Sequence, residues 1–306
     1  MPSWQAWCLN GAFRFFMKRH GDKPIDLNRV RASMRNPPKR ALHVPEGVRI
    51  REVREDGLHF DVAEAGESSA SSSPSTVVLY LHGGGYFFGS PQTHRQVIIA
   101  MARACGGPAY GLYYRLAPEH PFPGAVEDAA RAYRWLQRRY PDARIVVAGD
   151  SAGGGLALVT ALGVRDEGLP LPAAIIGFSP WTDLAITGQS VERNARACAM
   201  FTPKGMRAGA GLYLGAGDPC DPRASPLYAD LKGLPPMLLF ASQHEILLDD
   251  TLRLAERARA AGVEVEVVLR ERLPHVWPIF VRILPEAREA LARVEAFVRG
   301  LGPASA

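Results

Sequence analysis

The stretch "RIVVAGDSAGGGLALVTALG", Arg144–Gly163, holds a buried strand, a tight turn and the start of a helix in direct succession. The apolar run before Gly149 predicts the strand, and the small and apolar residues after Ser151 predict the helix. The turn itself, "GDSAG", has a serine between two glycines. A sharp strand-to-helix turn leaves little room for side chains, so glycine two residues to either side lets the serine hydroxyl stand above the strand end.

The same alternation continues on both sides of this stretch. Two runs flanking Asp56-Gly57 predict a hairpin, and later apolar runs alternate with helical patterns to the end of the chain. Repeated strand–helix units predict an α/β fold with a mostly parallel central sheet and helices on both faces. The predicted strands are 48–53, 58–63, 76–81, 108–114, 143–149, 173–180, 235–242 and 263–270, and the helices between or after them are 94–105, 124–140, 152–168, 247–262 and 286–300.

One long segment interrupts this alternation of strands and helices. Residues 181–235 contain no clear strand, and a connection of that length is normally functional or folds as an insertion. We therefore expect a helical cap made of this insertion and of an N-terminal segment, 1–45. The core is expected in two parts, 46–180 and 236–306.

Composition and charge exclude several classes of protein. The net charge of +5 comes from scattered Lys and Arg rather than from a basic stripe with interleaved aromatics, so no nucleic-acid partner is expected. The four cysteines stand alone, without metal-ligand spacing, which favours reduced thiols, a cytoplasmic location and no metal. The glycines after Ser151 lack the Lys-Ser/Thr of a nucleotide-binding loop, and no cofactor is expected.

The N-terminus is not expected to insert into a membrane. No apolar run reaches the length of a membrane span, and the first residues lack the layout of a signal peptide. Trp4, Cys8, Ala12–Phe13 and Phe16 recur near helical spacing instead. We interpret them as the packing face of an amphipathic helix, with contact to a membrane surface as the alternative.

A serine hydroxyl needs a base to become a nucleophile, and in this fold the base follows the serine with an acid between them. Of the two histidines after Ser151, His275 is favoured over His244 because it follows the last predicted strand. The acid is expected after the strand 235–242. Glu245 is nearest to the strand end, Asp249 is the second choice, and Asp249 or Asp250 is a candidate helix cap.

A second glycine-rich stretch, "LHGGGYFFGS", Leu81–Ser90, follows another predicted strand. Attack on a carbonyl creates an oxyanion that needs N–H donors, and glycine lets backbone N–H groups approach closely. We expect the donors to be Gly83, Gly84 and Ala152. His82 precedes the serine in the chain, so a role in holding the loop is favoured for it.

These motifs together resemble the hormone-sensitive lipase family of α/β-hydrolases, from about Thr76 onward. The resemblance implies serine esterase activity through Ser151, Glu245 and His275, with Gly85 and Asp150 supporting the loop and the turn. The chain departs from the commoner "HGF" of the family, since it has "HVW" at 275–277. The motifs that carry the resemblance are "HGGGY", "YRLAPEHPFPGAVEDA", "GDSAGG", "SPWTDL", "DPRASPLYADLKGLPP", "EILLDD" and "PHVW".

The resemblance implies a small-molecule ester with a short-to-medium acyl group as substrate. The "HVW" variant looks like a subgroup with short-chain acetyl esterases and a terpene lactone hydrolase, so lactone hydrolysis is one alternative. A non-catalytic small-molecule receptor on the same scaffold is another. Tyr86, Phe87 and Phe88 are candidates for the pocket wall, as are Trp4, Phe13 and Met17 if the N-terminal helix forms a lid. A homodimer is left open.

Overall fold

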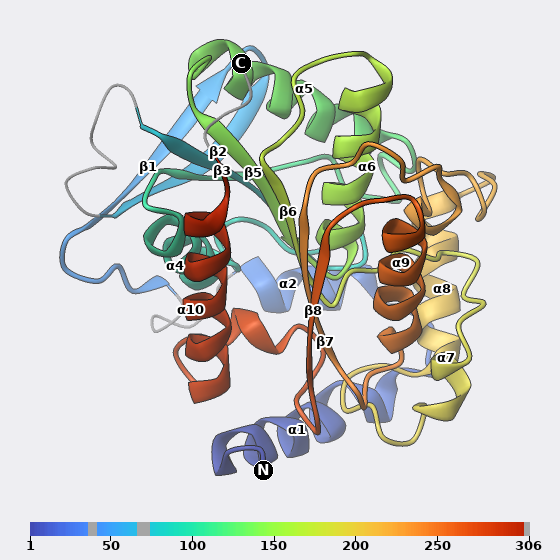
Figure 1. Cartoon of the computed structure of the whole chain (residues 1–306). Helices are drawn as coiled ribbons and strands as arrows, with labels where there is room; N and C mark the ends of the chain where they lie inside the picture. The colour runs from blue at the N-terminus through green and yellow to red at the C-terminus, as the bar shows by residue number, and fades with distance from the viewer. Residues whose placement is uncertain (36–41, 66–73, 303–306) are drawn as a thin grey trace.

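An eight-stranded sheet forms the centre of the computed structural model, which describes residues 1–35, 42–65 and 74–302 (Figure 1). The strand order is β1-β2-β4-β3-β5-β6-β7-β8; β2 is antiparallel to both neighbours, and all other pairs are parallel. The predicted mostly parallel sheet is therefore confirmed. The strands are β1 Val48–Glu55, β2 Leu58–Ala65, β3 Thr76–Leu81, β4 Ala109–Leu112, β5 Arg144–Asp150, β6 Ala174–Phe178, β7 Met237–Ser242 and β8 Val265–Arg270.

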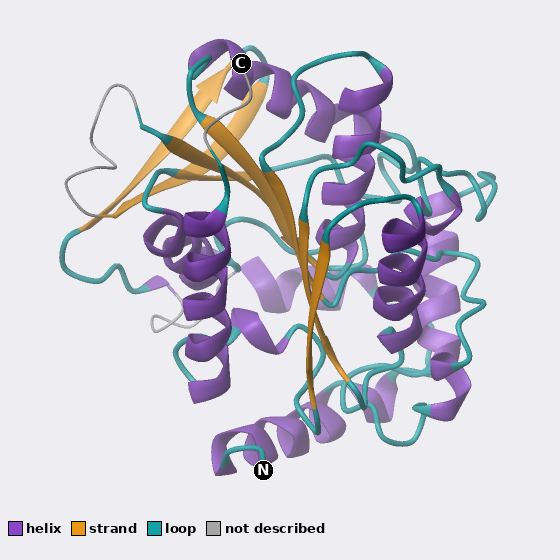
Figure 2. Ribbon diagram, viewed as in Figure 1, coloured by secondary structure: helices purple, strands orange, loops and turns teal. Residues whose placement is uncertain are grey.

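Helices cover both faces of this sheet (Figure 2). Alternate residues of a strand point to opposite faces, and in β3 this sends Val77 and Leu79 into one core and Val78 and Tyr80 into the other. The first core lies under α5, α6 and α9, and the second lies under α4 and α10. The helices are α1 Trp4–Phe16, α2 Leu27–Arg35, α4 Arg95–Cys105, α5 Gly124–Arg139, α6 Ala152–Asp166, α7 Ser190–Arg193, α8 Pro203–Leu214, α9 Leu248–Ala260 and α10 Pro285–Gly300.

The order of the strands creates a natural position for a site. From β3 the chain moves to β4 at one side, and from β5 it proceeds through β6 to the other side. Loops at the carboxyl ends of β3 and β5 therefore diverge, and ligands of open α/β sheets bind at such a point. Both glycine-rich motifs follow these two strands.

The segment 181–235 contains α7, α8 and no strand. The N-terminal segment reaches the same region: Arg14 and Lys18 donate hydrogen bonds to the carbonyl oxygens of Ala197 and Cys198. Residues 36–41 of the expected 1–45 segment lie outside the described part.

The N-terminal helix forms as predicted, but only part of the expected packing face packs: Phe13 is half-buried, with its ring 5.5 Å from that of Phe280. Trp4, Cys8 and Phe16 are exposed, whereas Ala6 is fully buried. The reason is the way in which the helix is fixed: its N-cap Ser3 bonds to Glu286 of α10. This turns Trp4 and Phe16 outward.

Candidate active site

Ser151 occupies a strained turn between β5 and α6. Its φ of 54° and ψ of −121° are rarely adopted by a residue with a side chain. The neighbouring glycines are required by close backbone contact. A Cβ on Gly149 would lie 2.2 Å from the Gly153 carbonyl oxygen, and one on Gly153 would lie 2.0 Å from that of Leu81. The turn therefore depends on the two glycines recognised in the sequence.

His275 lies directly against this serine, although 124 residues separate the two in the chain. Its Nε2 is 2.9 Å from Ser151 Oγ, and its Nδ1 is hydrogen-bonded to Glu245 Oε2. The three side chains come from loops after β5, β7 and β8. His244 is elsewhere: its Nδ1 accepts the N–H of Arg272. The structure thus brings together the serine, histidine and first-choice acid expected from the sequence.

Glu245 is almost completely buried and has a partner for each carboxylate oxygen. Oε2 faces His275, while Oε1 accepts the N–H of Ser242 at 2.7 Å and the hydroxyl of Ser179 at 2.9 Å. A buried charge needs such partners, because desolvation is otherwise very costly. These bonds fix the direction in which the carboxylate meets the imidazole.

The other two acids face away from His275. Asp249 accepts the N–H of Ser190 and an Arg193 guanidinium N–H. Asp250 accepts the N–H groups of Thr182 and Asp183, and burial raises its pKa well above the ordinary value. The expectation that one of them caps α9 is wrong, because both lie inside its first turn, where they join it to the loop after β6.

Ser179 is a member of this cluster that the sequence analysis did not single out. Its hydroxyl donates to Glu245 and accepts the N–H of Val276 at 3.1 Å, next to His275. Its φ is 50°, so a second strained residue ends β6. The only sequence signal was its place in the "SPWTDL" motif.

One of the N–H groups expected to bind the oxyanion, that of Gly83, already has an acceptor. That N–H is donated to Asp150 Oδ1 at 3.0 Å, so it is already occupied. Within the described residues, the N–H groups of Gly84, Gly85 and Ala152 have no acceptor. Gly84 and Gly85 have φ values of +118° and +60°, which glycine adopts at little cost.

Asp150 joins the serine turn to the glycine loop. Besides the Gly83 N–H, its Oδ1 accepts the Tyr80 hydroxyl at 2.8 Å, and Oδ2 is 3.4 Å from His94 Nε2. Burial alone would raise the pKa of Asp150, but His94 and the Tyr80 hydrogen bond outweigh it and hold that pKa below the ordinary value. Burial likewise opposes the charge on His94, and Asp150 outweighs this and raises the pKa of His94.

His82 lies beneath the loop rather than beside the serine. Its Nδ1 donates to the Gly83 carbonyl oxygen at 2.7 Å, and the carbonyl oxygen of His82 accepts the Tyr114 hydroxyl. Burial lowers the pKa of His82 to about 3, so it is neutral near pH 7. These contacts make it a support for the loop.

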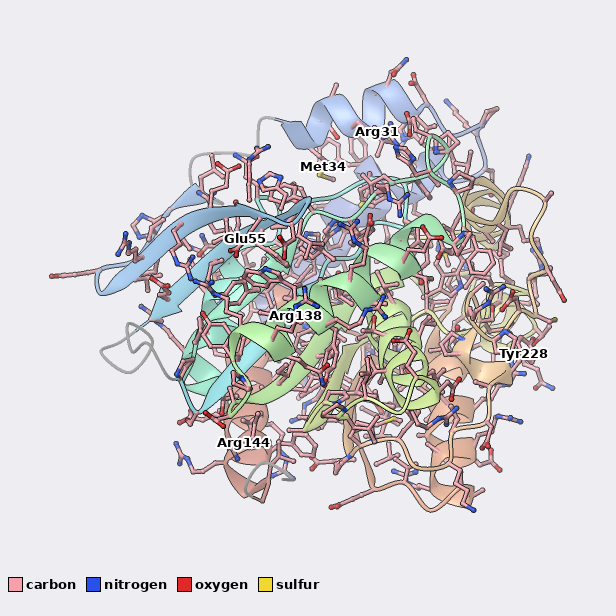
Figure 3. All side chains as sticks on the ribbon, turned by 90° about the horizontal axis from the view of Figure 1, so that it is seen from above. Arg31, Met34, Glu55, Arg138, Arg144 and Tyr228 are labelled. Atoms are coloured by element: carbon pink, nitrogen blue, oxygen red, sulfur yellow. The ribbon has the colours of Figure 1, made fainter. Side chains whose placement is uncertain are left out.

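Aromatic side chains lie on the glycine loop, on α8 and against His275. Tyr86 stacks on Tyr213 of α8, with ring centroids 3.7 Å apart, and the Phe201 ring is 5.1 Å from that of His275. Phe87 is buried and Phe88 is half-buried. Arg31 of α2, labelled in Figure 3, donates to the Phe87 carbonyl oxygen at 2.9 Å and so fixes the N-terminal segment against this loop.

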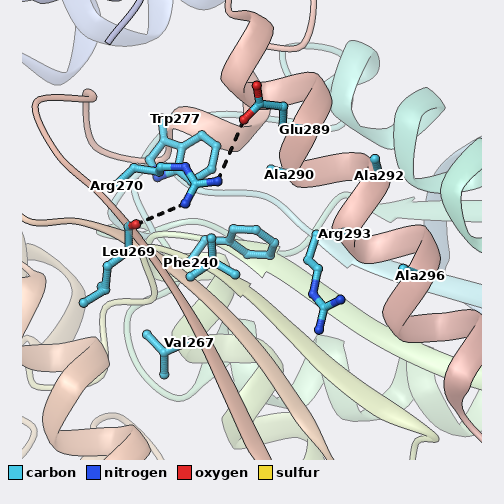
Figure 4. A pocket seen from close by; sticks show the side chains of 11 residues that line it. Phe240, Val267, Leu269, Arg270, Trp277, Glu289, Ala290, Ala292, Arg293 and Ala296 are labelled. Atoms are coloured by element: carbon cyan, nitrogen blue, oxygen red, sulfur yellow. Dashed lines mark hydrogen bonds and ion pairs between the residues drawn. The ribbon is translucent and has the colours of Figure 1, made fainter. Parts of the chain in front are cut away.

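A pocket of about 600 Å³ between β8 and α10 contains none of these site residues (Figure 4). Phe240, Trp277 and Arg270 line it, with Glu289 and Arg293 from α10. Among the described residues, no group of three or more His, Cys, Asp or Glu is placed to hold a metal ion. No helix in the described ranges is both long and apolar enough to cross a membrane.

Comparison with known proteins identifies the family of this chain. Residues 78–279 match the family described as the alpha/beta hydrolase fold. An acetyl-hydrolase of Streptomyces hygroscopicus is 45% identical over 224 residues, which cover 72% of this chain and 75% of that protein. An esterase of Acinetobacter venetianus is 34% identical over 256 residues, or 83% of each chain.

Solved structures agree equally well. An esterase from the bacterial hormone-sensitive lipase family is 38% identical, with a TM-score of 0.89 and coverage of 98% of this chain and 99% of that one. The esterase EstE5, soaked with p-nitrophenyl butyrate, is 39% identical with a TM-score of 0.87, covering 96% and 97%. The chain therefore belongs to the alpha/beta hydrolase fold family, among the esterases of the hormone-sensitive lipase family, and it is a serine carboxylesterase.

Proposed function

We propose that the chain hydrolyses short-to-medium acyl esters through Ser151 as nucleophile, His275 as general base and acid, and Glu245 as the residue that orients His275. The observation that carries this proposal is the chain of contacts Ser151 Oγ–His275 Nε2–Glu245 Oε2. Glu245 accepts from Nδ1, so Nε2 is free to take the serine proton. The carboxylate also stabilises the imidazolium that then forms.

The oxyanion donors in this proposal are the N–H groups of Gly84, Gly85 and Ala152. They replace the set expected from the sequence, because the Gly83 N–H is bound to Asp150. Ala152 is the first residue of α6, where the helix dipole adds to the stabilisation of negative charge. Gly83 has a supporting role in this arrangement.

The reaction then proceeds in two balanced halves. Ser151 Oγ bonds to the ester carbonyl carbon while its proton passes to His275 Nε2; the carbon–oxygen bond to the alcohol breaks, and the alcohol leaves with that proton. Water next attacks the acyl-enzyme and gives a proton to His275. The bond to Ser151 breaks, the acid is released, and the proton returns to the serine.

We also propose that residues 1–45 and 181–235 form a cap over Ser151. Two contacts support it: Arg31 binds the loop at Phe87, and the Phe201 ring lies against His275. The aromatic side chains near the serine suit an apolar acyl or alcohol group. Trp4 is 72% exposed and takes no part in this lining.

Hydrolysis of p-nitrophenyl butyrate tests the nucleophile. Ser151→Ala is expected to lower kcat by about 10⁴-fold or more. Ser33→Ala, at an exposed serine of α2, is the matched control and should leave kcat unchanged. Full activity in Ser151→Ala would rule the proposal out. A set of lactones measured beside open-chain esters separates ester from lactone hydrolysis on the same triad.

A further inference from the structure

The outward face of α1 carries four large aromatic side chains that no other part of the described chain covers. Trp4 is 72% exposed, Trp7 78%, Phe15 57% and Phe16 72%. We call these four residues the aromatic face. No other Trp or Phe of the described residues is exposed to this degree. Large exposed apolar side chains gathered on one helix mark an interaction site.

The opposite face of the same helix is firmly attached to the body of the protein. Ala6 is buried, the Asn10 side chain donates to the Arg272 carbonyl oxygen at 2.8 Å, and the Phe13 ring lies 5.5 Å from that of Phe280. The helix therefore cannot turn to bury the aromatic face without breaking these contacts and the Ser3–Glu286 bonds. The exposure is built into the fold.

The charged residues of α1 itself and of the turn that follows it are all positive. Residues 1–21 contain no Asp or Glu. Among the described residues, Arg14 and Lys18 donate to backbone carbonyl oxygens at 196–198 and to no carboxylate. The Arg19 guanidinium lies 4.8 Å from the centroid of the Phe15 ring. Aromatic side chains with adjacent cations are the combination by which a helix lies in the interface of an anionic bilayer.

We propose that α1 docks the protein on the surface of a phospholipid bilayer that carries anionic headgroups. The aromatic face enters the headgroup region, and Arg19 contacts the lipid phosphates, while Arg14 and Lys18 add positive charge nearby. A second copy of this chain fits less well, because a two-fold contact through this face would bring the same cations of both copies together.

The position of α1 gives the docking a consequence for substrate access. Lys18 binds the carbonyl oxygen of Cys198, and three residues further on the Phe201 ring contacts His275. A bilayer held against α1 therefore lies next to the segment that borders the candidate active site. Esters dissolved in the bilayer would be concentrated at that edge of the molecule.

Vesicle binding followed by tryptophan fluorescence tests this proposal independently of catalysis. The chain has five tryptophans, and Trp135, Trp181 and Trp277 are buried, so a change on binding reports Trp4 and Trp7. We expect a blue shift and co-sedimentation with phosphatidylcholine vesicles that contain phosphatidylglycerol. Binding to pure phosphatidylcholine should be weaker, and added salt should weaken binding to the anionic vesicles.

Two double variants each remove one half of the aromatic face: Trp4→Ser/Trp7→Ser and Phe15→Ser/Phe16→Ser. Each is expected to lower the vesicle partition coefficient at least about tenfold, and Arg19→Gln about fivefold on anionic vesicles only. Leu171→Ser/Leu252→Ser, at exposed leucines far from α1 in sequence, is the matched control and should bind like wild type. The thermal unfolding midpoint of each variant verifies that it folds.

The proposal is overturned if the wild type does not bind anionic vesicles, or if it binds as tightly after the aromatic substitutions. A dimer in solution that is lost in Trp4→Ser/Trp7→Ser, together with no vesicle binding, would also overturn it and assign the face to a second copy.

Discussion

At the scale of single residues, the choice between Glu245 and Asp249 can be tested directly. Glu245→Gln keeps the shape but removes the charge that orients and stabilises His275, so kcat should fall on the order of 10⁴-fold. Asp249→Asn removes a charge that faces Ser190 and Arg193. It should leave kcat near the wild-type value. Steady-state kinetics on p-nitrophenyl butyrate distinguish them, and the reverse pattern would assign the acid to Asp249.

Ser179 is expected to act through Glu245 rather than on the substrate. Ser179→Ala removes one donor to the carboxylate and leaves the Val276 N–H unpaired, so kcat should fall about tenfold with KM nearly unchanged. Ser190→Ala is the control, because Ser190 is equally buried and bonds to Ile246 and Asp249 instead. It should lower the thermal unfolding midpoint without a comparable loss of kcat. A loss confined to KM in Ser179→Ala would contradict the positioning role.

The meeting of Ser151, Glu245 and His275 was predictable, because the three residues come in a fixed order along the chain and each follows a predicted strand. The contact of Ser179 with Glu245 and the bond that occupies the Gly83 N–H were not. Both depend on which oxygen a particular N–H or O–H meets across the fold, as in the bond from Gly83 to Asp150. Such pairings have no local pattern.

At the scale of elements, substitution by alanine should change stability in opposite directions at two glycines of α6. A Cβ on Gly153 would lie 2.0 Å from the Leu81 carbonyl oxygen, so Gly153→Ala should prevent normal folding or greatly lower stability. A Cβ on Gly163 would meet no atom within 4 Å outside the backbone of its own helix. Gly163→Ala should raise the free energy of unfolding by about 1 kcal/mol through better helix propensity. Urea denaturation measures both; a neutral Gly153→Ala would contradict the close contact between turn and loop.

The ion pair between His94 and Asp150 should make stability depend on pH. His94 directly precedes α4, and Asp150 ends β5. The folded pKa of His94 is raised, so its contribution is fully present below the unfolded value near 6.5 and is lost as pH rises through the folded pKa. The folded pKa of Asp150 is lowered, so its contribution is present above its unfolded value near 3.9 and is lost as pH falls.

His94→Gln tests this dependence. Its loss of unfolding free energy relative to wild type should be largest in mildly acidic buffer, between those limits, and should shrink in alkaline buffer. Urea denaturation at a series of pH values measures it. A loss that grows as pH rises through the alkaline range would contradict the ion pair.

Most elements were predictable from hydrophobic periodicity and from the turn residues between segments. For example, β3, β5 and β7 are continuous apolar runs, and α5 has a clear apolar face. The orientation of α1 was not predictable. Its packing is decided by Ser3, Asn10 and Phe13, which meet partners more than 260 residues away. The hydrophobic period included Phe13, but it also selected Trp4, Cys8 and Phe16, which are exposed.

At the scale of the whole molecule, the strand order explains why distant motifs meet. The loops after β3 and β5 diverge at the point where the sheet changes direction, and the loops after β7 and β8 supply Glu245 and His275. The fold class followed from alternating strands and helices. The positions of residues 181–235 and of the described N-terminal residues did not, because they are set by tertiary contacts such as that of Arg31 with Phe87.

The central claim is that Ser151 is the nucleophile of an acyl-enzyme. Its most direct test is peptide mapping of the protein after treatment with a fluorophosphonate, which phosphonylates an activated serine. The account predicts one adduct per chain, located on Ser151, with loss of p-nitrophenyl butyrate hydrolysis in proportion to labelling. An adduct on a different residue that accounts for the inactivation, or full activity in protein labelled at Ser151, would contradict it.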